Sequence, residues 1–345
     1  MIQLAYWLLV FGKIHRQREK QGAIVCEPVS LVICSHKGLQ DLKKHLPHWL
    51  QQEYPEFEII LIDDGSDDGT EAYVKSLIQN YPQLKYHYLH KIQSGKKLPL
   101  LSSVGFAKYD WLALTDVDCE PAGKLCLKAM MKSLQKDTDL VIGYAPYKPK
   151  AGLLNAFIRY ESCLNAIQMF GAAAYGLAYA AVGRNLVYKK KLLTPQAICL
   201  EVPYGDDDLL LQHYAHHITA GYCIDPNGFT YTDAETRYID YFRRKSRHYA
   251  TSRSYKLSSK IYLTLYFLSL ICFYMSVIIL GFSTNLNLAL SLFLLKYIIC
   301  WPMFCNLAKK FHEPGLCKLF PLLELLYVCH ILLQFPLLLK KRKHW

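Results

Sequence analysis

Three short stretches of this 345-residue chain carry clustered carboxylates. They read DDGSDDGT at 63–70, TDVD at 115–118 and GDDD at 205–208. Asp116 and Asp118 are one residue apart, so on an extended strand both side chains point the same way. Two close carboxylates are unfavourable without a positive partner, and Mg²⁺ or Mn²⁺ prefers oxygen ligands. The pair therefore predicts a divalent-cation site that would also hold a diphosphate.

The other two acidic stretches each have a structural and a chemical interpretation. Residues 63–70 combine glycines for a tight bend with Asp and Thr for a helix cap, or they supply a carboxylate that accepts hydrogen bonds from a base or ribose. Residues 206–208 precede an apolar helical run, where acidic side chains favour the helix N-terminus. Three adjacent carboxylates exceed what capping needs, so Asp207 or a neighbour is also a candidate general base toward a hydroxyl.

Basic side chains that suit a diphosphate occur at two places. Lys96 and Lys97 follow Gly95, and the stretch 241–260 holds seven Lys/Arg and no acidic residue. Within it, Arg244 and Arg247 are one helical turn apart and could face the same phosphates. An amphipathic helix that binds anionic lipid head groups is the alternative interpretation of this stretch.

The acidic stretches follow elements that would position them at one edge of a sheet. Short apolar runs predict buried strands at 29–34, 58–62, 85–89 and 111–114. Leucines and other apolar residues recur at helical spacing in 39–52 and 70–80. This alternation predicts an α/β fold with a mostly parallel sheet covered on both faces, and ligands gather at the carboxyl ends of such strands.

Composition places part of the chain at a membrane. The chain is 52% hydrophobic with a net charge of +12 and a mean hydropathy of +0.08, which excludes a disordered protein. The basic clusters at 241–260 and 340–343 flank the most apolar third, which favours a membrane surface over nucleic acid as partner. The twelve cysteines are scattered without metal-ligand spacing and predict reduced thiols, and the histidines at 213–217 are read as an exposed helix face.

The hydropathy pattern predicts three regions: a membrane-associated segment at 1–24, a catalytic domain at 25–250 and a membrane region at 251–345. Residues 1–12 are too few to span a bilayer, and charge follows them, so we expect an interfacial anchor or the stub of a span instead of a secretion signal. Spans are expected at 261–282 and 286–307, whereas 316–339 contains prolines and polar residues and is expected to be re-entrant or interfacial. The positive-inside rule predicts a catalytic domain facing the cytoplasm.

The order of the motifs resembles that of a membrane-bound family 2 glycosyltransferase with the Rossmann-like GT-A fold. The matching elements run over about residues 28–250 and read V-S-L-V-I-C-S, D-D-G-S-D-D-G-T, G-K-K, T-D-V-D, G-D-D-D and R-x-x-R-H. The resemblance implies inverting transfer from a nucleotide-sugar, usually a UDP-sugar, to a hydroxyl of a glycan or membrane-linked acceptor in cell-envelope polysaccharide or glycolipid synthesis. It also implies a multi-pass protein of the inner membrane.

The resemblance assigns roles residue by residue. It implies Asp207 as the general base and Asp116 and Asp118 as ligands of Mg²⁺ or Mn²⁺. Acceptor contacts are expected from Asp206, Arg184 and Asn185. Donor contacts are expected from Cys34, Ser35, Asp63, Asp64, Lys96, Asp116, Arg244, Arg247 and His248.

Two departures from the family pattern restrict the expected activity. The first loop reads His36-Lys37-Gly38 where the family usually has N-E, and R-x-x-R-H replaces the Q-x-x-R-W of processive synthases. We therefore expect transfer of one sugar per encounter. The alternatives are a polyprenyl-phosphate sugar transferase, whose phosphate acceptor needs no strong base, and a non-catalytic nucleotide-binding subunit of the membrane.

Overall fold

The computed structural model describes residues 1–16, 26–90, 95–202, 204–215, 217–282 and 285–339. The predicted basic tail 340–343 and His216 lie outside these residues. The chain divides into two compact units, which are described separately. We call residues 20–148 and 176–234 the sheet unit, and residues 1–19, 149–175 and 235–345 the helical unit.

The sheet unit is built on a seven-stranded sheet in the order β3-β2-β1-β4-β7-β6-β8. The first four strands in sequence, which pair in parallel, are β1 (Val29–Ser35), β2 (Phe57–Asp64), β3 (Leu84–Leu89) and β4 (Trp111–Asp116). β7 (Leu186–Lys189) runs antiparallel to β4 and β6 (Leu140–Ile142), and β8 (Ala220–Tyr222) is parallel to β6. The four predicted strands and the mostly parallel α/β sheet are confirmed. The predicted burial of residues 85–89 is wrong, because β3 is the edge strand of the sheet and its Lys85 and Tyr88 are exposed.

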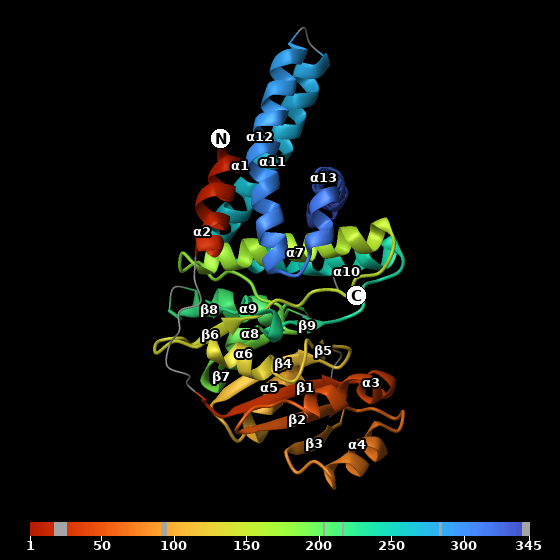
Figure 1. Ribbon diagram of the computed structural model, residues 1–345. Coiled ribbons are helices and arrows are strands. Elements are labelled where there is room, and N and C mark those ends of the chain that lie inside the picture. The colour runs from red at the N-terminus through yellow and green to blue at the C-terminus, as the bar shows by residue number, and fades with distance from the viewer. Residues whose placement is uncertain (17–25, 91–94, 203, 216, 283–284, 340–345) are drawn as a thin grey trace. The chain divides into compact units, whose positions relative to one another are not determined.

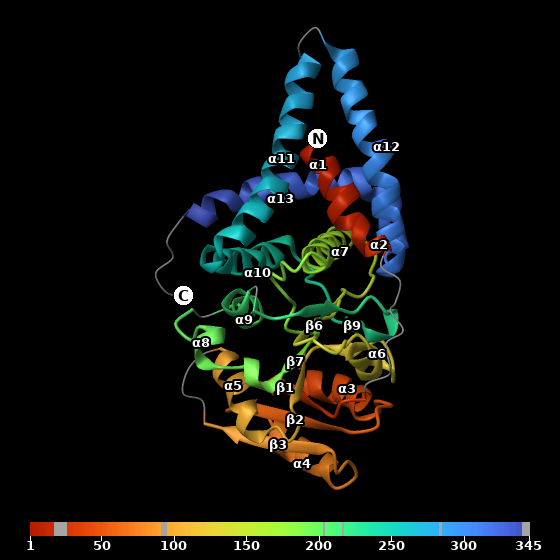
Figure 2. The ribbon, with the colours of Figure 1, turned by 90° about the vertical axis from the view of Figure 1, so that its left-hand side faces the viewer.

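Helices cover both faces of this sheet. Figure 2 shows α3 (Leu39–Leu50) and α6 (Cys126–Lys132) on one side and α5 (Lys97–Phe106) and α8 (Pro195–Ile198) on the other. The unit also contains α4 (Thr70–Ile78), α9 (Asp206–Tyr214) and a two-stranded sheet of β5 (Glu120–Pro121) and β9 (Thr230–Tyr231).

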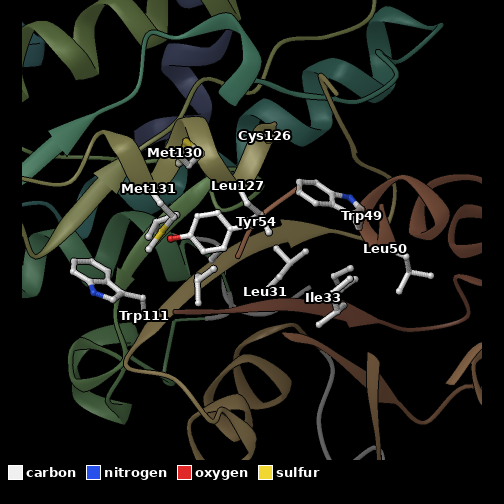
Figure 3. Packing of buried hydrophobic residues seen from close by; sticks show 14 of the residues in the cluster. Leu31, Ile33, Trp49, Leu50, Tyr54, Trp111, Cys126, Leu127, Met130 and Met131 are labelled. Atoms are coloured by element: carbon white, nitrogen blue, oxygen red, sulfur yellow. The ribbon is translucent and has the colours of Figure 1, made fainter. Parts of the chain in front are cut away.

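A buried apolar cluster fixes the carboxyl-edge loops to the sheet (Figure 3). Alternate residues of β1, Leu31 and Ile33, face this cluster because strand side chains alternate between the two faces. Trp49 of α3 packs there as well, and its indole N–H donates to the Cys119 carbonyl at 2.9 Å. The segment that follows the Asp116–Asp118 pair is therefore held by a buried hydrogen bond.

The helical unit contains long apolar helices (Figure 1). Three of them, spanning Leu257–Phe282, Leu286–Lys310 and Pro314–Pro336, are long and apolar enough to cross a membrane. These correspond to α11 (Leu257–Phe282), α12 (Leu286–Lys310) and α13 (Phe320–Leu339) with the turn before it. The other helices of the unit are α1 (Ile2–Ala5), a π-helix at Tyr6–Phe11, α2 (Gly12–Arg16), α7 (Leu153–Ala173) and α10 (Tyr238–Thr251).

The N-terminal apolar residues pack inside the helical unit. Trp7 is completely buried, Gln3 donates to the Tyr266 carbonyl at 2.7 Å, and the Tyr6 hydroxyl donates to the Tyr262 carbonyl at 2.5 Å. Residues 2–14 form an apolar helical segment shorter than the three long helices.

α13 runs across the direction of α11 and α12, nearly end-on in Figure 1 and lengthwise in Figure 2. A buried polar cluster joins the three helices: the Glu324 carboxylate pairs with Lys296 and accepts from the Tyr274 and Tyr297 hydroxyls at 2.8 Å each. The interfacial or re-entrant placement expected for 316–339, like the boundaries of the three predicted regions, stays a prediction.

Candidate active site

The carboxyl ends of β1, β2 and β4 meet at one edge of the sheet, as the sequence predicts. In the strand register Cys34 lies opposite Asp116, and Ser35 lies opposite Asp63. Residues 82 positions apart, Cys34 and Asp116, are thereby brought to one edge by backbone pairing alone.

Asp63, near the end of β2, helps to hold the tight turn that follows the strand. Asp63 is fully buried. One carboxylate oxygen accepts from the Ser66 amide at 2.9 Å, and the other accepts from the Tyr86 hydroxyl at 2.7 Å. Asp64 follows it on the opposite face of the strand, and its carbonyl lies 2.7 Å from the His36 ring nitrogen Nδ1. The donor contacts predicted for Asp63 and Asp64 stay predictions.

The unusual first loop is fastened to this turn. The Lys37 amide donates to the Ser66 hydroxyl at 2.8 Å, and the Lys37 ammonium forms an ion pair with Asp67 at 2.9 Å. Lys37 adopts a left-handed φ of 52°, which is unusual for a residue with a side chain. Lys37 stands where the family usually has an acidic residue, and it connects the loop after β1 to the loop after β2.

Lys96, just before α5, forms an ion pair with Asp116 at the end of β4. Burial by itself would raise the pKa of Asp116, but the Lys96 ammonium outweighs burial and the net pKa is lowered. Burial raises the pKa of the Cys34 thiol to about 12 although the Lys96 charge acts to lower it, so this thiol is protonated at neutral pH. Cys34 and Lys96 therefore lie in one charged neighbourhood at the sheet edge.

The two carboxylates of the T-D-V-D stretch form a candidate metal centre. Ligand atoms of Asp116, Asp118 and Cys119 lie within 4.8 Å of one another. Asp118 is exposed, and one of its oxygens accepts from the Thr232 hydroxyl at 3.1 Å. Two carboxylates with an exposed member form a donor set that a hard, oxygen-preferring cation such as Mg²⁺ or Mn²⁺ can use.

The third acidic stretch opens α9. Gly205, with a left-handed φ of 77°, precedes the helix. The Asp207 carboxylate accepts from the Gly183 amide at 2.7 Å through one oxygen and from the Asp208 amide at 2.9 Å through the other. Burial, and then repulsion from Asp206, raise the pKa of Asp207 to about 6. A carboxylate with this pKa is ionised at neutral pH and more basic than an ordinary aspartate, as a general base requires.

The G-R-N segment at 183–185 contributes to the same neighbourhood in different ways. The Arg184 guanidinium lies 4.6 Å from the Tyr147 ring centre and donates to the Ala145 carbonyl at 2.9 Å. The Asn185 amide is buried and donates to the Tyr144 and Gly228 carbonyls at 2.8 and 2.7 Å. Both amide protons of Asn185 are therefore used inside the fold, and its predicted acceptor contact stays a prediction.

Arg244, Arg247 and His248 lie on α10 of the helical unit. Arg244 forms an ion pair with Glu235, with one nitrogen-to-oxygen distance of 2.9 Å. Their predicted contacts with the donor are not tested by the geometry within either unit and stay predictions.

Sequence analysis missed how Asp207 is held. The Gly183 amide reaches its carboxylate, and a Cβ built on Gly183 would lie 3.3 Å from the Asp207 oxygen. Gly183 precedes the predicted acceptor contacts Arg184 and Asn185, but spacing gives no indication that a backbone N–H 24 residues upstream binds the candidate base. Lys97 was noted only as positive charge, although its side chain is almost completely buried.

A comparison with known proteins shows the family to which the domain that contains this site belongs. Residues 30–179 match the model of glycosyl transferase family 2. The chain carries a family 2 glycosyltransferase domain. The predicted family and the GT-A fold are confirmed, with long apolar helices following the domain. A solved mannosyltransferase from Pyrobaculum calidifontis, in complex with GDP-Man and Mn²⁺, shares the fold with a TM-score of 0.57 at 14% identity, over 91% of this chain and 94% of that one.

Curated relatives of the chain match it over part of their length. The poly-β-1,6-N-acetyl-D-glucosamine synthase of Staphylococcus epidermidis is 25% identical over 193 residues, which is 55% of this chain and 44% of the synthase. An uncharacterized glycosyltransferase of Escherichia coli, YibD, is 25% identical over 112 residues, 32% of each chain. The chain thus spans less than half the length of the synthase.

Proposed function

We propose that the protein is an inverting, metal-dependent glycosyltransferase that moves one sugar from a nucleotide-sugar to a hydroxyl of a glycan or membrane-linked acceptor. The observation that carries the proposal is the pair of opposite electrostatic environments at the sheet edge. Asp116 is held ionised by Lys96, while Asp207 has a pKa raised to about 6. An ionised Asp116 suits a cation that holds the charged leaving group, and an Asp207 with a raised pKa suits a base.

The donor half comprises the ends of β1, β2 and β4. Lys96 offers positive charge beside Asp116, and Asp116 and Asp118 would hold Mg²⁺ or Mn²⁺ against the diphosphate. When bound, the cation neutralises the negative charge that develops on the departing nucleoside diphosphate. Cys34, Ser35, Asp63 and Asp64 at the ends of β1 and β2 are proposed to face the nucleoside. A uracil base is our expectation, since UDP-sugars are the usual donors in the family.

The acceptor half is the N-terminus of α9. Asp207 takes the proton from the acceptor hydroxyl as its oxygen attacks the anomeric carbon of the sugar. The bond between that carbon and the diphosphate oxygen breaks, and the electron pair leaves with the nucleoside diphosphate. A single displacement of this kind inverts the anomeric configuration. Asp206, Arg184 and Asn185 are the proposed acceptor contacts.

The membrane setting is also part of the proposal. Three long apolar helices support membrane association, and we propose that the catalytic domain faces the cytoplasm at the inner membrane. The name of the Staphylococcus epidermidis synthase supports a role in cell-envelope polysaccharide synthesis. The raised pKa of Asp207 favours a hydroxyl acceptor over a polyprenyl phosphate, because a phosphate oxygen is already ionised and needs no base.

The test uses full-length protein in detergent with membrane lipid extract and a panel of nucleotide-sugars, and it measures release of nucleoside diphosphate. We expect release with one class of donor, loss of release in excess EDTA, and recovery on adding Mg²⁺ or Mn²⁺. Unchanged release in EDTA would exclude Asp116 and Asp118 as ligands of an essential metal. No release with any donor would favour the non-catalytic alternative.

A further inference from the structure

Two consecutive lysines, Lys96 just before α5 and Lys97 as its first residue, bind different parts of the site through their side chains. Lys96 pairs with Asp116, the candidate metal ligand. Lys97 is 5% exposed and donates to three backbone carbonyls, those of Ile198 at 2.5 Å, Cys199 at 2.9 Å and Val202 at 2.6 Å. An ammonium group has three protons and no acceptor, so these carbonyls satisfy it completely.

This arrangement opposes the local preferences of the sequence. The N-terminus of a helix carries partial positive charge, which disfavours cations, and the first turn of α5 has no acidic residue to compensate. A buried ammonium also loses its hydration, and burial lowers the pKa of Lys97, an effect that Asp206 opposes. Tertiary contacts must therefore hold Lys97 in place.

The three carbonyls belong to the segment that delivers the candidate base. Ile198 is the last residue of α8, and Cys199 follows it with a left-handed φ of 50°. The chain then passes Val202 and reaches Gly205, which also has a left-handed φ, directly before Asp206 and Asp207 of α9. The described residues of this connection, 199–202 and 204–205, contain little regular structure, and the Lys97 ammonium binds the carbonyls of two of them.

We propose that Lys97 is a positioning residue of the transfer reaction: it fixes the segment before α9, and hence Asp207, relative to the metal-binding carboxylate held by Lys96. The inference rests on the proposed function. Because Lys96 and Lys97 are neighbours on one backbone, the donor half and the acceptor half of the site are tied to the same helix start. Displacement of a reacting group by about 1 Å costs on the order of 10²-fold in rate.

The test replaces Lys97 by methionine, which keeps the length of the side chain and removes all three hydrogen bonds. We expect kcat to fall about 10- to 100-fold and the KM for the donor to change less than about twofold, because the hydrogen bonds of the Lys97 ammonium go to the segment before α9 and not to a proposed donor contact. Hydrogen exchange of the amides at 199–202 should become faster. Lys190→Met is the matched control, since the Lys190 ammonium donates to a single carbonyl, that of Ala107, at 3.0 Å; its kcat and its exchange at 199–202 should equal those of wild type.

Each outcome bears on one of the two proposals. Release by wild-type protein together with unchanged kcat in Lys97→Met would overturn the positioning role and leave the proposed function standing. No release by wild-type protein with any donor would instead remove the proposed function. If Lys97→Met does not fold, Lys97→Gln, which keeps two N–H donors, is measured in the same way. Failure of both variants to fold would make Lys97 a stability residue and overturn the inference.

Discussion

Replacing Asp207 by asparagine should stabilise the protein at neutral pH while removing its activity. Burial and Asp206 raise the pKa of Asp207 from 3.8 to about 6. Between about pH 4 and 6 the carboxyl group of the folded protein still holds its proton, whereas the same group in the unfolded chain has lost it. The stability of the folded state therefore falls as pH rises through this window. About two pKa units at 1.36 kcal/mol each correspond to a penalty of about 3 kcal/mol at pH 7.

The asparagine variant escapes this penalty but loses a hydrogen bond. Its side-chain oxygen can accept from the Asp208 amide or the Gly183 amide, and its NH₂ group then faces the other N–H. This loss costs about 1–2 kcal/mol at every pH. The net gain at pH 7 is therefore about 1–2 kcal/mol. The gain relative to wild type grows by about 2 kcal/mol between pH 4 and pH 7, because the unfolded chain is already partly ionised at pH 4.

Thermal unfolding of full-length protein in detergent measures this change. For a domain of this size, 1 kcal/mol shifts Tm by about 2–4 °C, so the Tm difference between Asp207→Asn and wild type should grow by several degrees from pH 4 to pH 7. Donor turnover should fall about 10²- to 10⁴-fold. In wild type, kcat should decline as pH falls below about 6, where Asp207 gains a proton.

Asp137→Asn controls for the change in net charge, because Asp137 is exposed between α6 and β6. The reasoning fails if the Tm difference between Asp207→Asn and wild type is the same at pH 4 and pH 7, since the pKa of Asp207 would then not be raised. Turnover by Asp207→Asn at the wild-type rate would remove this residue from the mechanism.

Three further substitutions test other contacts. Asp206→Asn removes the charge that helps raise the pKa of Asp207, so the acid limb of the kcat profile should move to lower pH. Gly143→Ala would place a Cβ 2.4 Å from the buried Asn185 side chain, and this overpacking should cost about 1–3 kcal/mol, measured as a lower Tm. Glu324→Leu leaves its buried lysine partner on α12 unpaired and should cost about 3–5 kcal/mol.

Matched variants separate these effects from general disturbance. A Cβ on Gly123 meets no atom within 4 Å, so Gly123→Ala should leave Tm nearly unchanged; equal loss in both glycine variants would contradict the packing argument. The double variant Lys296→Met/Glu324→Leu leaves no buried charge unpaired and should recover most of the stability lost in Glu324→Leu. An acid limb that does not move in Asp206→Asn would show that burial alone raises the pKa of Asp207.

Local patterns in the sequence determined the framework of the site. Strands β1, β2 and β4 were predicted because each is a short apolar run, and such runs reflect burial on both faces of a parallel sheet. β3 was predicted in the same way, but it is a partly exposed strand at the edge of the sheet. The carboxylates after β2 and β4 were placed at one edge because parallel strands share their direction. The family followed from six motifs in order, and the family model confirms it.

Only the tertiary structure decided which partner each charged group has. Asp63 looked equivalent to Asp64 in sequence, but the Ser66 amide and the Tyr86 hydroxyl donate hydrogen bonds to its carboxylate. Lys97 looked like its neighbour Lys96, but it binds carbonyls about 100 residues away in sequence. Local periodicity records the face on which a residue lies, whereas a buried hydrogen bond depends on which distant backbone atoms packing brings within about 3 Å.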